Sequence, residues 1–232
     1  MPSRYGTGEL YGFDFSTLPP ERVRELSSAP HKSLVCPFKP VQPGKPAPKC
    51  NKRGGVCSLR QFVQDGQGRV EGRGEPVTTC PSRFLEGNLI AQWVGETLLG
   101  TSRPVMISQL PFLMGEIRAE GEADQAAVGK IDEVLVNAEG GTLRWCALEF
   151  QAVYFSGDSM ENDFEVMREW TGPGVPFPPV QRRPDFRSSG PKRLMPQLQT
   201  KVPTISRGGA RPTAASPSEW GRVGRFQLSL SA

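Results

Sequence analysis

The run from Trp145 to Phe155 constrains the fold of this chain more than any other stretch. Every residue in it is apolar except Glu149 and Gln151, and a short apolar run of this kind predicts a buried β-strand. Side chains two positions apart on a strand point to the same face, so these two polar residues share one face of the sheet. Because a buried carboxylate is costly without a partner, the strand requires a cation or a hydrogen-bond donor beside Glu149.

The preceding residues, from Lys130 onward, predict a second strand that forms a hairpin with the first. A Gly-bearing turn joins the two, and its turn-forming residues are Asn137, Gly140 and Gly141. If Asn137 pairs with Thr142 across this turn, Asp132 lies opposite Ala147. The hairpin register therefore decides which side chains accompany Glu149.

In that register Asp132, Glu149 and Gln151 share one face of the sheet. Two neighbouring carboxylates repel each other unless a divalent cation lies between them, and oxygen ligands suit Mg²⁺. Such an ion can bind a phosphate and activate a water molecule. The alternative is an ordinary hairpin with one wet face, on which Glu149 and Gln151 merely point to solvent. A register slip of one residue would turn Asp132 to the opposite face.

Four of the five cysteines fall in a segment that lacks hydrophobic periodicity, and they are Cys36, Cys50, Cys57 and Cys80. Four thiolates on loops can bind one tetrahedral metal ion, which would stabilise this Gly- and Pro-rich segment. Free or disulfide-paired cysteines are the alternative. Cys146 lies on the strand face opposite Glu149 and is expected to be a small core residue.

The remaining motifs exclude several classes of enzyme. The chain has one histidine, His31, five residues before Cys36. A surface role is expected for it, with substitution as a metal ligand the alternative, and no nucleophile elbow or Cys/His signature surrounds it. No Gly-rich phosphate loop is present. No apolar run approaches the roughly 20 residues of a membrane helix, and the N-terminus lacks an apolar signal core. We therefore expect a cytoplasmic protein without a membrane segment.

The charge is unevenly distributed along the chain. Residues 181–232 carry ten Lys or Arg and two acidic residues, whereas residues 1–180 carry 18 basic and 22 acidic residues. A basic region beside an acidic body suits a polyanionic partner such as nucleic acid. A solvated, disordered basic tail is the alternative.

Periodicity predicts further elements along the chain. Apolar residues recur at helical spacing from Ser82 to Leu98, and Gly100 ends that pattern. Pro104–Leu110 is a strand candidate, and Ser58–Gln64 is expected to form one or two helical turns. Pro19 and Pro20 are expected at the first turn of a short helix.

The order of Asp, turn and Glu-x-Gln on an apolar strand resembles the core of the PD-(D/E)xK nucleases, with Gln151 where Lys is commoner. Four further runs are RYGTGELYG, TTCPSRF, WCALEFQAVYFSGDSMENDF and RRPDFRSSGPKRLMPQLQTKVPT. With them, the chain resembles a NotI-type type II restriction endonuclease over roughly residues 4 to 206.

This resemblance implies an α/β fold, with a mixed central sheet flanked by helices and an N-terminal, loop-rich four-cysteine metal module. The expected divisions are a module over residues 1–81, a catalytic core over 82–206 and an atypical tail over 207–232. The resemblance implies that Asp132 and Glu149 bind Mg²⁺ and that Gln151 completes the motif. It also makes Cys36, Cys50, Cys57 and Cys80 the ligands of a structural metal, iron in the family, although thiolate chemistry allows zinc equally.

A further carboxylate often joins such sites; Glu116 is our choice and Glu96 the alternative. The family cuts GC-rich, palindromic double-stranded DNA as a homodimer. The basic segment 181–206 then supplies candidate DNA contacts, namely Arg182, Arg183, Arg187, Lys192 and Arg193. Lys52 and Arg53 are a second candidate region.

The tail departs from the expected pattern. After Thr204 we expect an apolar strand, but the sequence is rich in Gly, Ala, Arg, Pro and Ser. We hypothesise that a frameshift or gene decay replaced the native C-terminus. Resequencing the locus and translating the neighbouring frame tests this idea, which fails if that frame encodes no apolar strand. The alternative function is accordingly a decayed nuclease that binds DNA without cutting it.

Overall fold

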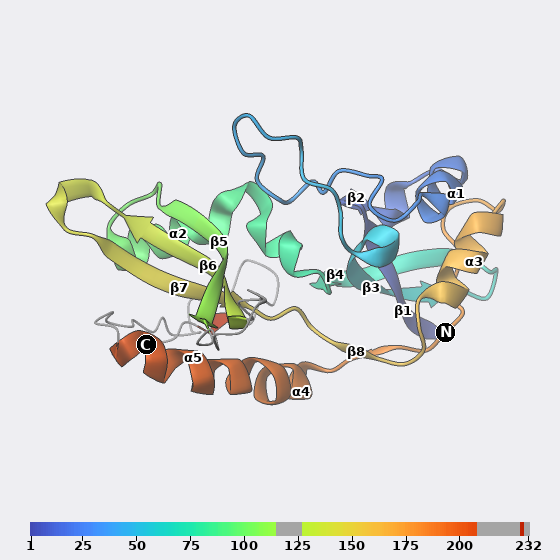
Figure 1. Cartoon of the computed structure of the whole chain (residues 1–232). Helices are drawn as coiled ribbons and strands as arrows, with labels where there is room; N and C mark the ends of the chain where they lie inside the picture. Colours follow the sequence, from blue (N-terminus) through green and yellow to red (C-terminus); the bar gives the residue numbers. More distant parts are fainter. Residues whose placement is uncertain (115–126, 208–227, 230–232) are drawn as a thin grey trace, which may run out of the picture. The chain divides into compact units, whose positions relative to one another are not determined.

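The computed structural model describes residues 1–114, 127–207 and 228–229, and these form two compact units (Figure 1). Unit 1 contains Met1–Gly87 and Ala152–Ser189, and unit 2 contains Asn88–Gln151 together with the described residues after Ser189. The grouping differs from the sequence-based boundaries at residues 81 and 82, because residues 152–189 join the N-terminal unit.

Unit 1 is built on a four-stranded antiparallel sheet with the order β2-β1-β3-β4. Its strands are β1 (Ser3–Leu10), β2 (Phe13–Asp14), β3 (Val56–Gln64) and β4 (Val70–Thr78). The prediction of helical turns over Ser58–Gln64 is wrong, because this segment lies within β3, between two partner strands. Pairing on both sides satisfies its backbone groups, which outweighs a weak local preference.

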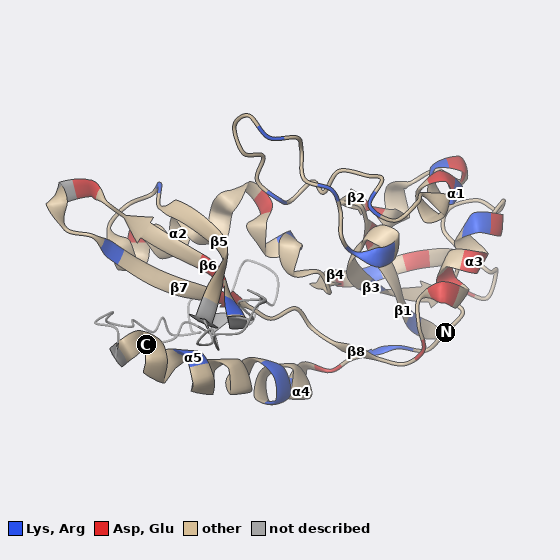
Figure 2. Ribbon diagram, in the orientation of Figure 1, with Lys and Arg blue, Asp and Glu red and all other residues tan. Residues whose placement is uncertain are grey.

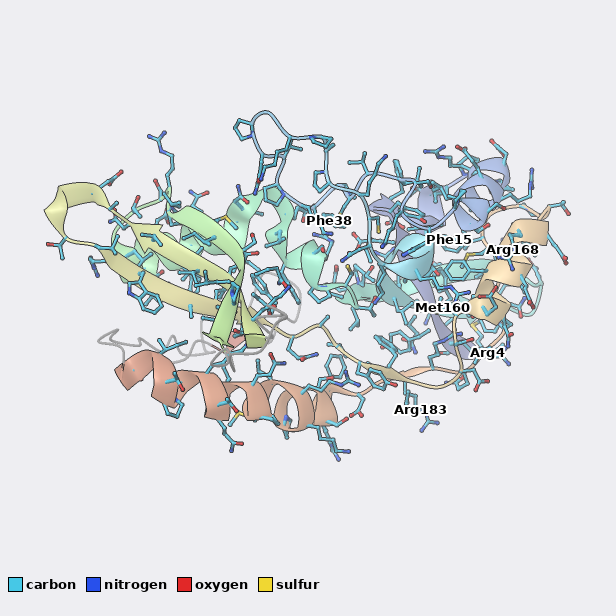
Figure 3. The ribbon with its side chains drawn as sticks, in the orientation of Figure 1. Arg4, Phe15, Phe38, Met160, Arg168 and Arg183 are labelled. Atoms are coloured by element: carbon cyan, nitrogen blue, oxygen red, sulfur yellow. The ribbon has the colours of Figure 1, made fainter. Side chains whose placement is uncertain are left out.

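The other elements of unit 1 surround this sheet. They are η1 (Phe15–Thr17), α1 (Pro20–Ser28), η2 (Arg53–Gly55), η3 (Pro81–Asn88, whose last residue belongs to unit 2), β8 (Phe155–Ser156), α3 (Glu161–Glu169), β9 (Arg183–Pro184) and α4 (Phe186–Ser189). Helix α1 starts with Pro20 in its first turn, as predicted. Phe15 lies in the interior (Figure 3), and the core joins Val23 of α1, Phe62 of β3 and Phe164 of α3. The segment after residue 151 therefore supplies part of the N-terminal core.

Unit 2 is built on a second antiparallel sheet with the order β10-β7-β6-β5. Its strands are β5 (Val105–Met114), β6 (Ala127–Asn137), β7 (Arg144–Phe150) and β10 (Leu228–Ser229), and η5 (Glu139–Gly141) lies in the β6–β7 connection. The strand candidate at Pro104–Leu110 and the hairpin are confirmed. The α/β content is also confirmed, but the expected mixed sheet is absent from the described residues, where every strand pair is antiparallel.

Helices cover both faces of the unit 2 sheet (Figure 1). On one face, α2 (Leu89–Val94) and the π-helix η4 (Gly95–Leu99) share a core with Leu135 and Leu148. On the other face, α5 (Met195–Arg207), which continues from η6 (Gly190–Leu194), contributes Ile205 to a cluster with Val134. The hairpin is thus held between two helical layers.

The helix expected from Ser82 to Leu98 is interrupted. Gly87 and Asn88 both have positive φ, +55° and +56°, which no continuous α-helix allows. Helical structure resumes at Leu89 and ends at Gly100, as predicted, with Gly100 in the left-handed region at φ +74°. Arg144 donates to the carbonyls of Leu98 and Leu99, so the end of the helix is tied to β7.

Among the described residues, no helix combines the length and the apolar character needed to span a bilayer.

Candidate active site

Asp132 and Glu149 meet where the β6–β7 ladder ends. The last residue pair of that ladder is Glu133 with Leu148, and one further step in the same register puts Asp132 opposite Glu149. The predicted pairing of Asn137 with Thr142 is wrong, because Asn137 pairs with Arg144. The connection is longer than a tight turn and shifts the register by two residues, which leaves each side chain on its predicted face.

Asp132 lies just beyond the last backbone pair of β6 with β7, and its side chain contacts the neighbouring strands instead. Its Oδ2 accepts a hydrogen bond of 2.9 Å from the backbone N–H of Phe150, beyond the end of the ladder. Its Oδ1 is 3.5 Å from Nε2 of Gln109, a residue with φ of +56°. The β5–β6 pairing skips Gln109 and Asp132 and resumes on both sides of them. Strained backbone of this kind concentrates at functional sites.

Lys201 of α5 is the neighbour of Glu149 that the sequence did not predict. Its Nζ lies 2.7 Å from Oε1 of Glu149, and both side chains are almost completely buried, with 9% and 5% of their surface exposed. The ammonium also donates to the carbonyl of Lys130 at 2.6 Å and to Oε1 of Gln197 at 3.3 Å. These three acceptors match the three N–H bonds of the ammonium. The two residues of this ion pair, Glu149 and Lys201, lie 52 positions apart in the sequence.

The second oxygen of Glu149 is left without a partner. Oε2 is buried, and no donor among the described residues reaches it. Burial raises the pKa of Glu149, and the charge of Asp132 also raises it, whereas the hydrogen bond and charge of Lys201 lower it. A buried acceptor without a partner is costly, so the position of Oε2 calls for an explanation. Asp132 and Glu149 could together satisfy it by holding a cation.

The other predicted acidic-site residues are placed as follows. Gln151 follows β7 directly and is half-buried; β7 ends at Phe150, five residues before the predicted end of the strand at Phe155. Glu116 lies outside the described residues. Glu96, the alternative, is exposed in η4, where its carboxylate accepts from Gln92.

Glu133 is a buried acid that sequence reasoning passed over. It points away from Asp132, since neighbours on a strand alternate between faces. Its carboxylate accepts a hydrogen bond of 2.8 Å from Ser108 Oγ. Burial raises the pKa of Glu133. Cys146 packs against the α2 side of the sheet, as predicted.

The four N-terminal cysteines lie buried in unit 1, and all are free thiols. Three of them, Cys36, Cys50 and Cys57, belong to one core cluster, and the N–H of Cys80 donates to the carbonyl of Cys57. Burial raises the pKa of Cys57 to about 12, with Cys80 and Cys50 adding to the shift. Over residues 1–114, 127–207 and 228–229, no three His, Cys, Asp or Glu side chains are arranged around one metal position.

The candidate DNA contacts divide into one buried residue and four exposed ones. Arg182 is 3% exposed, and its guanidinium binds both carboxylate oxygens of Asp163, at 2.9 and 2.6 Å. This arrangement favours a structural role for Arg182 instead of a phosphate contact. The exposed residues are Arg183, which points outward in Figure 3, Arg187, Lys192 and Arg193.

Two of these exposed residues, Lys192 and Arg193, lie on η6, where Figure 2 shows basic colouring at the start of the helical segment. In the second candidate region Lys52 is half-buried, whereas the side chain of Arg53 is 89% exposed. Lys52 donates to the carbonyl of Thr79 at 3.0 Å, and Arg53 lies 3.7 Å from Glu161. Lys52 therefore stabilises the end of β4.

Comparison with known proteins identifies the family of this chain. The family model described as restriction endonuclease NotI matches residues 23–214, a range that includes Asp132, Glu149 and Lys201. No curated protein and no solved structure matches the chain. The family match covers most of the sequence, and the chain belongs to the NotI restriction endonuclease family.

Proposed function

We propose that this protein is a type II restriction endonuclease that hydrolyses phosphodiester bonds in double-stranded DNA with Mg²⁺ bound by Asp132 and Glu149. The observation that carries the proposal is the carboxylate pair at the end of the β6–β7 ladder, with Oε2 of Glu149 buried and without a partner among the described residues. Family membership supplies the reaction class.

The side chains present fit a divalent cation. Asp132 and Glu149 offer hard oxygen ligands, which Mg²⁺ prefers, and substrate phosphate and water would complete its coordination. A bound Mg²⁺ would bind the phosphate oxygens and lower the pKa of a coordinated water molecule. The chain itself holds both carboxylates in place, through the Phe150 N–H on Asp132 and the Lys201 ammonium on Glu149.

DNA recognition is proposed to use the exposed basic residues Arg183, Arg187, Lys192 and Arg193. Arginine binds guanine through two parallel hydrogen bonds in the major groove, which suits a GC-rich site. A palindromic site requires two equivalent copies of the reader, so we propose a homodimer.

The four cysteines of unit 1 are proposed to hold a structural iron or zinc ion. All four thiols are buried in unit 1; burial raises the pKa of Cys50, and repulsion by the charges of Cys36 and Cys80 raises it further. A bound cation would relieve that repulsion, because metal ions stabilise thiolates. Free thiols suit a reducing compartment, so we propose that the protein works in the cytoplasm.

Plasmid cleavage with and without Mg²⁺ tests the proposed activity. We expect cleavage by the wild type with Mg²⁺, and none by Glu149→Gln. Glu139→Gln is the matched control, because Glu139 is an exposed acid in the turn between the same two strands. Salt-dependent DNA binding without cleavage would instead indicate the decayed nuclease, and cleavage by Glu149→Gln would contradict the assigned site.

A further inference from the structure

The β6 and β7 strands diverge from ladder pairing at the point where the two carboxylates lie. Glu133 and Leu148 form the last pair, so backbone hydrogen bonds do not fix the separation of Asp132 and Glu149. Two side-chain contacts replace them. Asp132 binds the N–H of Phe150, and Lys201 bridges the carbonyl of Lys130 on β6 and Oε1 of Glu149 on β7.

Lys201 contacts one carboxylate oxygen of Glu149 and makes no contact with the other. Its ammonium contacts Oε1 at 2.7 Å, whereas Oε2 is buried and has no partner in the described part of the chain. Fixing Oε1 fixes the rotation of the carboxylate, and therefore the direction in which Oε2 points. The ammonium is itself fixed by the Lys130 carbonyl and by Gln197, one turn earlier on α5.

From this geometry we propose that Lys201 is a positioning residue for the acidic pair. Lys201 presents Oε2 of Glu149 to the cation and clamps the open end of the hairpin. The inference rests on the proposed function, since it assigns a role toward the same carboxylates. It adds a residue that the Asp…Glu-x-Gln pattern does not contain, from a helix that follows the hairpin by about fifty residues.

A structural role alone makes a different prediction. A buried ion pair that only anchors α5 would affect the stability of unit 2 and leave the metal affinity of the folded protein unchanged. A positioning role changes the affinity and the turnover number, because residues that orient a ligand typically contribute about 10- to 100-fold to metal affinity. Metal affinity in the absence of DNA therefore separates the two roles.

The test uses the full chain with Mn²⁺ as the probe, by electron paramagnetic resonance and calorimetry. We expect Lys201→Met to bind Mn²⁺ about 10- to 100-fold more weakly than the wild type, with a lower kcat and an unchanged KM for DNA. Lys201→Arg is expected to be intermediate, because a planar guanidinium keeps the charge but not the three-way geometry.

Two further variants define the background and the control. Glu149→Gln gives the Mn²⁺ bound at other positions, since thiolates prefer softer metals. Gln199→Met makes a polar-to-Met change on an exposed position of the same helix, and we expect wild-type affinity. Urea unfolding of each variant reports the folded fraction, so that affinities are compared for folded protein.

The outcomes are distinguishable. If the wild type neither binds Mn²⁺ nor cleaves DNA, the proposed function fails. If the wild type does both, and folded Lys201→Met binds Mn²⁺ within about threefold of it, the positioning role is overturned while the function stands. If Lys201→Met does not fold, Lys201→Gln is measured in its place. Failure of both neutral variants to fold would make Lys201 a stability residue and would also overturn the inference.

Discussion

Each unit contains a buried ion pair, and the two pairs differ in what they leave unsatisfied. In unit 1, Arg182 binds both oxygens of Asp163, and its other N–H groups reach the carbonyls of Asp158 and Ser159. In unit 2, Lys201 uses all its donors, but Glu149 keeps one oxygen without a described partner. Burial raises the pKa of both carboxyl groups.

This difference separates a structural pair from a functional one. Burial of two charges is compensated only when hydrogen bonds satisfy the remaining polar atoms. The Arg182 pair meets that condition, so it stabilises the fold and has no capacity left for a ligand. The Lys201 pair does not meet it, because Oε2 of Glu149 has no described partner and the charge of Asp132 acts on the same carboxyl group. Counting satisfied atoms is therefore more informative than burial alone.

Replacing each pair with apolar residues should produce the largest contrast. We expect Lys201→Met with Glu149→Leu to lower cleavage at least about a thousand-fold, since loss of a metal site removes several kcal/mol of transition-state stabilisation. Arg182→Met with Asp163→Leu should keep cleavage, because apolar replacement of a satisfied buried pair is often neutral. Plasmid cleavage rates measure both. Cleavage by the variant with Lys201→Met and Glu149→Leu would contradict the functional role assigned to that pair.

Removing only one partner of the structural pair should be costly. Arg182→Met leaves the Asp163 carboxylate buried and unpaired, and we expect a loss of about 3–5 kcal/mol in the free energy of unfolding. Urea denaturation measures it. The neighbouring exposed residue gives the control, since Arg183→Met should change stability by less than about 0.5 kcal/mol. Equal effects at the two positions would contradict the assigned role of Arg182.

Relieving the strain at Gln109 should give a smaller effect of opposite sign. Its φ of +56° costs a side-chain-bearing residue about 1 kcal/mol, so Gln109→Gly is expected to stabilise unit 2 by about that amount. The same change in the other sheet, Gln61→Gly in β3, should destabilise the protein, because glycine weakens a regular strand. Thermal unfolding compares the two. Destabilisation by Gln109→Gly would remove the argument for strain at the site.

The thiol of Cys146 in unit 2 should react slowly, as should the buried thiol of Cys57 in unit 1. Burial raises the pKa of Cys146 to about 11, which favours the neutral thiol over the reactive thiolate. At pH 8 the thiolate fraction is then about one in a thousand, and labelling by iodoacetamide should rise about tenfold per pH unit below pH 11. Peptide mapping measures the rate, with urea-unfolded protein as the reference. A rate independent of pH would contradict this prediction.

The sequence predicted the faces of the hairpin better than its register. Strand side chains alternate with a period of two, so Asp132 and Glu149 could be assigned to one face from the pattern alone. The predicted pairing was displaced by two residues because the length of the connection was underestimated. A displacement by an even number of residues keeps each side chain on the same face of the sheet. The prediction that Asp132 and Glu149 share a face therefore held although the predicted turn was wrong.

Lys201 and Arg182 could not be assigned in the same way. Lys201 stands in the basic segment 181–206, which was assigned only to DNA contacts, although much of it forms η6 and α5. Arg182 was grouped with exposed arginines because sequence alone does not reveal that Asp163 lies against it. Both errors concern contacts between residues far apart in the chain, on which local patterns carry no information. The β3 strand was missed for a related reason, since its partners β1 and β4 determine its conformation.

The long interval between Glu149 and Lys201 has a consequence for synthesis. At about 5–20 residues per second, the ribosome adds the 52 residues that separate them in about 3 to 10 seconds. During that time a nascent chain carries the acidic hairpin without the lysine that bridges it. The Lys201–Glu149 contact therefore forms only after α5 has been made.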